Sequence, residues 1–102
     1  MRMMLNVAFP TGKFNELWKS GQLGPKMKQI IEDTKPEAIY FGKNTNGLRG
    51  AVVIVDVPSP ADLPRITEPW YLTFEAEMET SICMTPEDIE NIDVDALTKK
   101  YT

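Results

Sequence analysis

Side chains that could bind a ligand or transfer a proton occur on stretches of the chain that have the pattern of β-strands. Because alternate residues of a strand point to the same face, Asn6, Tyr40 and Asp56 can share one face of a sheet. A ladder of carboxylates has the same phase on the last such stretch: Glu75, Glu77 and Glu79. Two carboxylates held close in a partly dry cavity would form an acid/base pair with separated pKa values. The alternative is a solvated edge strand whose glutamates deter aggregation.

Histidine is absent, and Cys83 is the only cysteine. Without histidine the chain lacks the commonest general base, the usual catalytic triads and most catalytic zinc sites. Cys83 therefore has no histidine to activate it as a nucleophile, and a structural thiol is the favoured interpretation. Arg49 could clamp a ligand carboxylate, or it could be a solvated arginine of a hairpin.

Other kinds of site find less support. Glu77 and Glu79 could hold a hard cation together with Asp56, but no EF-hand spacing accompanies them, so we expect no metal. The loop at residues 44–50 lacks the Gly-Lys-Ser/Thr ending of a phosphate loop and joins two strands. No cofactor is expected.

Charge is distributed unevenly over the 102 residues. Residues 1–51 carry eight Lys/Arg and four Asp/Glu, whereas residues 52–102 carry three and eleven. Nucleic-acid binding needs a concentrated basic face, so a nucleic-acid partner is not expected. No stretch approaches the roughly 20 apolar residues of a membrane span, and no signal peptide is recognised. We therefore expect a cytoplasmic protein with no membrane partner, which also suits a single cysteine.

The stretch Gly50–Val57 is the element around which a fold must be built. Six of its eight residues are apolar and five are β-branched, which favours a strand in the interior of a sheet. The turn residues 44–47, Asn-Thr-Asn-Gly, join it in a hairpin to a strand at 37–43. Further strands are predicted at 4–9 and 75–84.

Helical spacing of apolar residues accounts for the rest of the chain. It predicts a helix, a break and a second helix over about residues 13–33. A third helix begins at Ser59-Pro60 and carries Trp70, although Pro64 and Pro69 predict that it is short or irregular. A terminal helix begins at Thr85-Pro86. Residues 1–3 and 99–102 are expected to fray.

This order of elements, β-α-β-β-α-β plus a terminal helix, is the ferredoxin-like arrangement of an α+β domain covering residues 1–102. Right-handed crossovers give a four-stranded antiparallel sheet in the order 4-1-3-2. Both main helices cover one face, so the other exposes apolar residues such as Val52 and Ile54 unless a C2 homodimer buries it. A glutamate, Asn6, Asp56 and Tyr40 would then form a row of roughly 15 Å across that face.

The chain resembles the dimeric α/β-barrel superfamily, and within it a group of small proteins described as a domain of unknown function. The resemblance spans residues 4 to about 90 and rests on short motifs: Phe9-Pro10, the hairpin Gly47–Gly50 with its strand, Ser59-Pro60-Ala61-Asp62-Leu63, Trp70, the strand start 74–78, and Pro86-Glu87-Asp88. It implies a homodimer whose two sheets enclose a cavity. That group has an aromatic–His pair where this chain has Tyr40-Phe41-Gly42, so no functional residue is carried over.

The leading hypothesis is a homodimer that binds a small, partly apolar molecule between its sheets. Its candidate ligand-binding residues are Asn6, Tyr40, Arg49, Asp56, Trp70, Glu77 and Glu79. One alternative is a cofactor-independent isomerase or monooxygenase-like enzyme, similar to members of the superfamily in fold only, with Asp56 or Glu79 as base. A second is a structural interaction module. An RNA-recognition module is rejected, because residues 51–57 contain no aromatic side chain.

Overall fold

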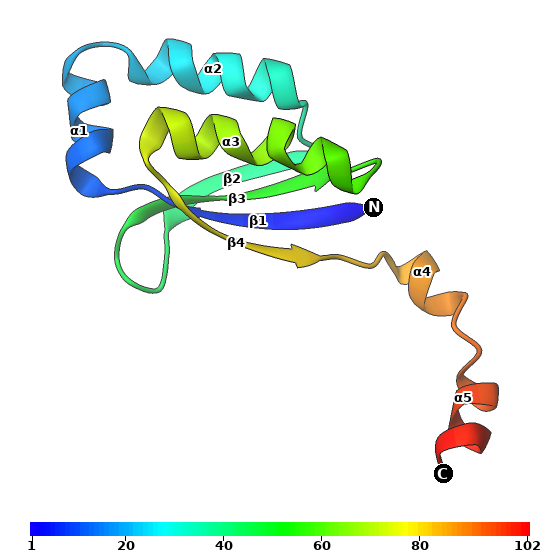
Figure 1. The fold of residues 1–102 in the computed structure, drawn as a ribbon. Helices are drawn as coiled ribbons and strands as arrows, with labels where there is room; N and C mark the ends of the chain where they lie inside the picture. Colours follow the sequence, from blue (N-terminus) through cyan, green and yellow to red (C-terminus); the bar gives the residue numbers. More distant parts are fainter.

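The computed structural model describes all residues from 1 to 102 and shows an α+β fold. Three helices cover one face of a four-stranded antiparallel sheet, and two further helices extend beyond the sheet (Figure 1). The elements are β1 (Arg2–Ala8), α1 (Thr11–Lys19), α2 (Leu23–Thr34), β2 (Ala38–Lys43), β3 (Arg49–Asp56), a 3-10 turn (Pro60–Asp62), α3 (Leu63–Phe74), β4 (Glu77–Ile82), α4 (Pro86–Glu90) and α5 (Val94–Tyr101).

The strands lie in the order β2-β3-β1-β4, which is the predicted order 4-1-3-2 counted from the other edge. The apolar strand β3 is therefore interior, as its composition predicted, with β2 and β1 antiparallel on its two sides. Strand β4 pairs with β1 and forms the second edge. This register decides which side chains share the open face.

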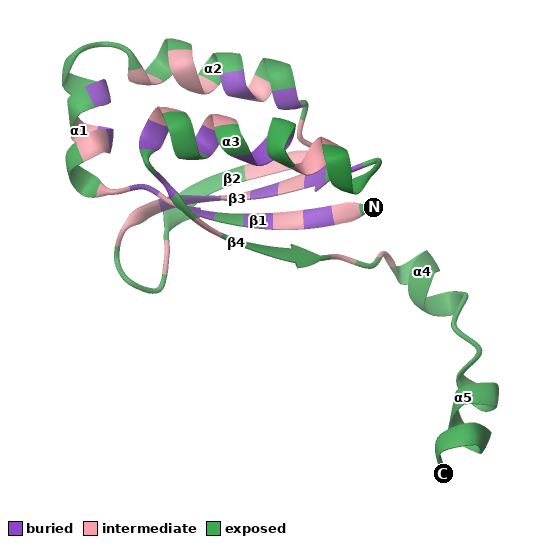
Figure 2. Ribbon diagram, viewed as in Figure 1, coloured by how far each residue is buried: buried purple, intermediate pink, exposed green.

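The core lies between the sheet and α1–α3. Alternate residues of β1 and β3 point into it, and Leu5 and Val53 are completely buried (Figure 2). Aromatic rings fill the space against the helices, with Phe9 only 4.8 Å from Phe74 between ring centroids. All fifteen residues of the buried apolar cluster lie between positions 3 and 76.

Helix α3 corrects the prediction of a short or irregular helix, because it runs for twelve residues with Pro69 inside it. Pro64 falls in the first turn, where its missing N–H costs no helical hydrogen bond. Pro69 does remove one, but burial of Ile66, Trp70 and Phe74 on the same face holds the helix together. Glu75 then ends the helix in a left-handed conformation with φ of 55°.

The ends of the chain also differ from the prediction. Met3 is buried in β1 rather than frayed, and α5 continues to Tyr101. The single terminal helix that the sequence predicts is instead two helices, α4 and α5. The helix starts at Ser59 and Thr85 are confirmed. The Ser59 N–H and hydroxyl both donate to the Asp62 carboxylate, while the Thr85 N–H donates to the Asp88 carboxylate and the Asp88 N–H donates to the Thr85 hydroxyl. Residues 83–102, here named the C-terminal arm, project away from the sheet (Figure 1). No helix is both long enough and apolar enough to span a membrane.

Candidate functional site: a groove on the open face of the sheet

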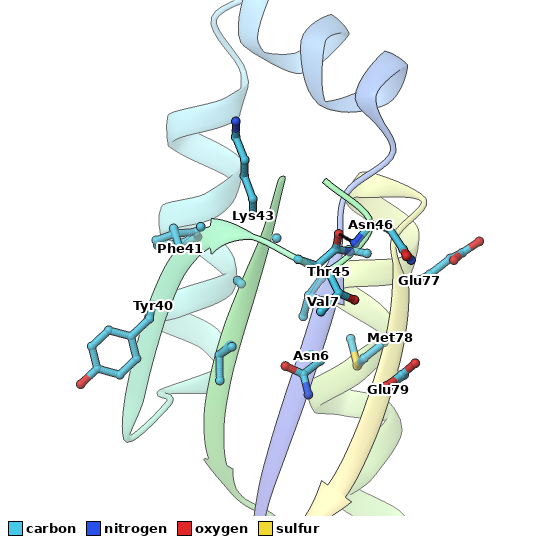
Figure 3. A pocket seen from close by; sticks show the side chains of 16 residues that line it. Asn6, Val7, Tyr40, Phe41, Lys43, Thr45, Asn46, Glu77, Met78 and Glu79 are labelled. Atoms are coloured by element: carbon cyan, nitrogen blue, oxygen red, sulfur yellow. Dashed lines mark hydrogen bonds between the residues drawn. The ribbon is translucent and has the colours of Figure 1, made fainter. Parts of the chain in front are cut away.

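A groove of about 590 Å³ lies on the face of the sheet that the helices leave open (Figure 3). All four strands and the β2–β3 hairpin loop contribute to it. Its sixteen lining residues are Asn6, Val7, Ala8, Tyr40, Phe41, Gly42, Lys43, Asn44, Thr45, Asn46, Gly50, Ala51, Val52, Glu77, Met78 and Glu79. Four of the seven candidates named from the sequence are therefore in one place: Asn6, Tyr40, Glu77 and Glu79.

The floor of the groove is a row of small residues. Gly42 pairs with Gly50, Gly50 with Ala8, and Ala8 with Glu77 across the four strands. A Cβ atom added at Gly42 would meet nothing within 4 Å, so this position opens into the groove. A Cβ at Gly50 would lie 2.6 Å from the carbonyl oxygen of Val7, so the close approach of β3 to β1 requires glycine there.

The next row of the sheet carries the polar side chains. Asn6 stands opposite Glu79 on one side and Val52 on the other, and Val52 in turn pairs with Tyr40. Val52 thus holds the position that the sequence assigned to Asp56. Figure 3 shows Asn6 on the same part of the face as Glu79, whereas the Tyr40 ring extends away at the β2 edge.

The hairpin loop forms the rim of the groove. The Asn44 side-chain oxygen accepts hydrogen bonds from the backbone N–H groups of Asn46 and Leu48, at 3.0 and 3.1 Å. Gly47 completes the turn with φ of 78°, a conformation that favours glycine. These bonds hold Thr45 and Asn46 beside the open face, where both line the groove.

Asp56 lies outside the groove, which corrects its predicted place in the polar row. It ends β3 opposite Arg2, and its carboxylate accepts a hydrogen bond from the Met1 ammonium at 3.1 Å. Four residues along the strands separate it from the row of Glu79, a distance of roughly 13 Å. Neither an acid/base pair of Asp56 with Glu79 nor a cation site shared with Glu77 is formed.

Arg49 and Trp70 lie on the helical side of the sheet, so neither can contact a ligand in the groove. The Arg49 guanidinium donates to the Asn15 side-chain oxygen at 2.7 Å and lies 4.7 Å from the centre of the Phe14 ring. Trp70 is completely buried in the core, and its indole N–H has no hydrogen-bond partner. The alternation of β3 predicts that Arg49 lies on the helical side of the sheet, because Arg49 has the same phase as the buried Ala51 and Val53.

Sequence reasoning missed the small floor and the loop rim. Gly42, Gly50 and Ala8 fall in one row only once the hairpin register is known. A usable signal was the turn at 44–47, because a hairpin turn sets which residues of its two strands face each other. Thr45 and Asn46 belong to that turn, for which the sequence pattern indicates only a connection between two strands.

The groove is acidic on one side. Glu77 and Glu79 stand on β4, while the Lys43 ammonium at the rim points away from the floor (Figure 3). Both glutamates are exposed in the single chain. Ligand groups that donate hydrogen bonds or carry positive charge would therefore be favoured near β4, and apolar groups over Ala8 and Val52.

No cluster of three or more Cys, Asp or Glu side chains is arranged to hold a metal ion. Cys83 follows β4, half-buried, with its backbone N–H donated to the carbonyl of Arg2. No protein-family model matches the chain, and no curated protein matches it significantly.

Proposed function

We propose that this chain binds a small, partly apolar molecule in the groove, and that it does so as a homodimer in which two open sheet faces meet. The topology fits a ferredoxin-like domain, and pairing of two such sheets would make a dimeric α/β barrel. Met4, Val52 and Ile54 are only partly buried in one chain, and pairing of the two sheets would also remove them from water.

The observation that carries the proposal is the floor of small residues. A sheet face that served only for protein contact would gain from side chains that fill the space, whereas Gly42 and Ala8 leave it hollow. Gly50 adds no side chain to the floor either, because the approach of β1 leaves no room for a Cβ there. The resulting volume of about 590 Å³ lies within the 300–1,000 Å³ typical of ligand sites. Binding is favoured over an isomerase or oxygenase activity, because Asp56, one of the two candidate bases, is outside the groove.

Gly42→Leu tests the proposal, because the new side chain would enter the open space above the floor without touching other atoms at its Cβ. Gly24→Leu on α2 is the matched control, since its added Cβ also meets nothing within 4 Å. The probe is the uncharged dye Nile red, whose fluorescence rises in apolar sites. We expect a several-fold loss of dye affinity in Gly42→Leu and none in Gly24→Leu.

Equal dye affinity in wild type and Gly42→Leu would contradict the groove as a binding site. Light scattering at micromolar concentration tests the dimer separately, with an expected mass of about twice the 11.5 kDa of the chain. A monomer at that concentration would contradict pairing of the open faces.

A further inference from the structure

We propose that the C-terminal arm docks on a second copy of this chain, where its apolar side chains cover the exposed edge strand β2. The inference does not depend on a ligand in the groove. It starts from the arm, which has apolar side chains but no surface of its own chain to bury them. Figure 2 shows the whole of α4 and α5 exposed, at a distance from the sheet.

The arm carries its apolar residues in a regular pattern. Val94, Leu97 and Tyr101 recur at helical spacing on α5, and Ile89 and Ile92 precede them. All five are exposed, with Tyr101 73% exposed. No extended contact joins α4 or α5 to the sheet or to α1–α3. A stripe of this kind is typical of a helix that packs against another surface.

Both arm helices are well capped but too short to be stable alone. The Thr85 hydroxyl accepts from the Asp88 N–H at 3.1 Å, and the Asp93 carboxylate accepts from the Ala96 N–H at 3.0 Å. Helices shorter than about 12–15 residues are marginal in water even with good sequences. The sequence thus specifies where α4 and α5 begin. Because α4 has only five residues and α5 only eight, packing against another surface must supply the rest of their stability.

Strand β2 is an exposed surface that lacks a partner, because it is an edge of the sheet that no other element covers. It pairs only with β3, which leaves backbone groups along its other side without strand partners. Tyr40 is 70% exposed and Phe41 is 56% exposed on its two faces. Natural sheets protect such edges with charges or by covering them with a helix or loop. The other edge, β4, carries two charges, Glu77 and Glu79, whereas β2 carries only Lys43 at its end.

Charge selects β2 over β4 as the docking surface. The arm carries five carboxylates from Glu87 to Asp95 and no basic residue before Lys99. Lys35 and Lys43 flank β2, and the nearby Glu37 is already paired with Arg2 at 2.7 Å. The acidic part of the arm would therefore be attracted there. The glutamates of β4 would repel it.

Symmetry explains why the arm would cover β2 of a second copy rather than β2 of its own chain. The arm leaves from β4, and β2 is at the opposite edge of the same sheet (Figure 1). Two chains related by a two-fold axis can exchange arms, so that both stripes and both edges are covered at once. The twenty residues of the arm and the β2 surface together reach the roughly 20–30 residues a side of a standard interface.

The first test uses two matched substitutions in the full chain. Leu97→Asp places a charge in the stripe, and Leu72→Asp makes the same change at an exposed position of α3. Sedimentation over a range of concentrations should show a dimer dissociation constant at least about tenfold larger for Leu97→Asp, and no change for Leu72→Asp. An unchanged dissociation constant for Leu97→Asp would overturn the proposal, even if the open faces still pair.

The second test locates the arm. One chain carries Cys83→Ser and Thr45→Cys next to β2, and the other carries Cys83→Ser and Ala96→Cys; both new positions are exposed. A short bismaleimide should link position 45 to position 96 when the two chains are mixed, and mass spectrometry identifies the linked peptides. Absence of the 45–96 link would overturn the proposal. So would a link that forms only within one chain when both substitutions are combined.

Discussion

Helices α3 and α5 have the same pattern in the sequence and opposite environments in the structure. Ile66, Trp70 and Phe74 of α3 are buried against the sheet. Val94 and Leu97 have the same kind of spacing on α5, and both are exposed. Periodicity therefore shows that a helix face needs a partner, but it does not show whether the same chain provides one. The fifteen residues of the buried cluster find their partners within residues 3–76, whereas the stripe of the arm finds none in its own chain.

The largest expected contrast comes from one kind of substitution made in each region. Val53→Asp puts a carboxylate at a completely buried position of β3, which should cost several kcal/mol and unfold the chain. Leu97→Asp in the arm should change the free energy of unfolding by less than about 0.5 kcal/mol at concentrations below the dimer dissociation constant. Urea unfolding followed by circular dichroism measures both. Similar losses in the two variants would show that the arm is part of the core.

Hydrogen exchange sharpens the same comparison without a mutation. Amides of β1 and β3 should open only with global unfolding, because both strands have partners on each side. Amides of α4 and α5 should exchange within seconds in dilute solution, since neither helix has a buried residue. Protection in the arm should then rise with protein concentration. Strong arm protection that is independent of concentration would mean that the arm docks on its own body.

The sheet was predictable because its signals are local and repeated. The apolar run of β3, the turn at 44–47 and the alternation of β4 led to the observed strand order. The start of β4 was placed two residues early, because Glu75 alternates correctly but ends α3 in a left-handed conformation. Such a conformation is unusual for a residue other than glycine, and the sequence carries no sign of it.

The site was only partly predictable, since it depends on register. Alternation correctly predicts that Asp56 is on the open face. The register, however, places Val52 and not Asp56 opposite Asn6, so Asp56 lies outside the groove. Asp56 is exposed at the end of β3, where its carboxylate stays in water and forms a surface ion pair with the Met1 ammonium. That contact joins residues 55 positions apart, and no pattern in the sequence could reveal it. Trp70 was named as a candidate although its helical spacing already indicated the core.

A smaller effect is expected inside the body, at the two glycines of the groove floor. Gly50→Ala brings a Cβ to 2.6 Å from the Val7 carbonyl oxygen, so backbone must shift, at a cost of roughly 1–3 kcal/mol. Gly42→Ala enters open space and should change stability by less than about 0.5 kcal/mol. Thermal unfolding of both variants makes the comparison. Equal melting temperatures would mean that β1 and β3 can separate at Gly50 without loss.

The smallest expected effect is a pH dependence confined to the arm. Hydrogen bonds from Thr85, first its backbone N–H at 2.9 Å and then its side chain, lower the pKa of Asp88 from its usual 3.8. Because the folded carboxyl binds a proton less readily than the unfolded one, its stabilisation of α4 is present above the usual pKa. It is lost as the pH falls through the lowered pKa of the folded state. The NMR shift of the Asp88 side-chain carboxyl carbon between pH 6 and pH 2 should follow this titration, with a midpoint below 3.8. Asp88→Asn should abolish it and leave the amides of β1 and β3 unaffected, whereas a midpoint at or above the usual value would show that the capping box of α4 does not persist in solution.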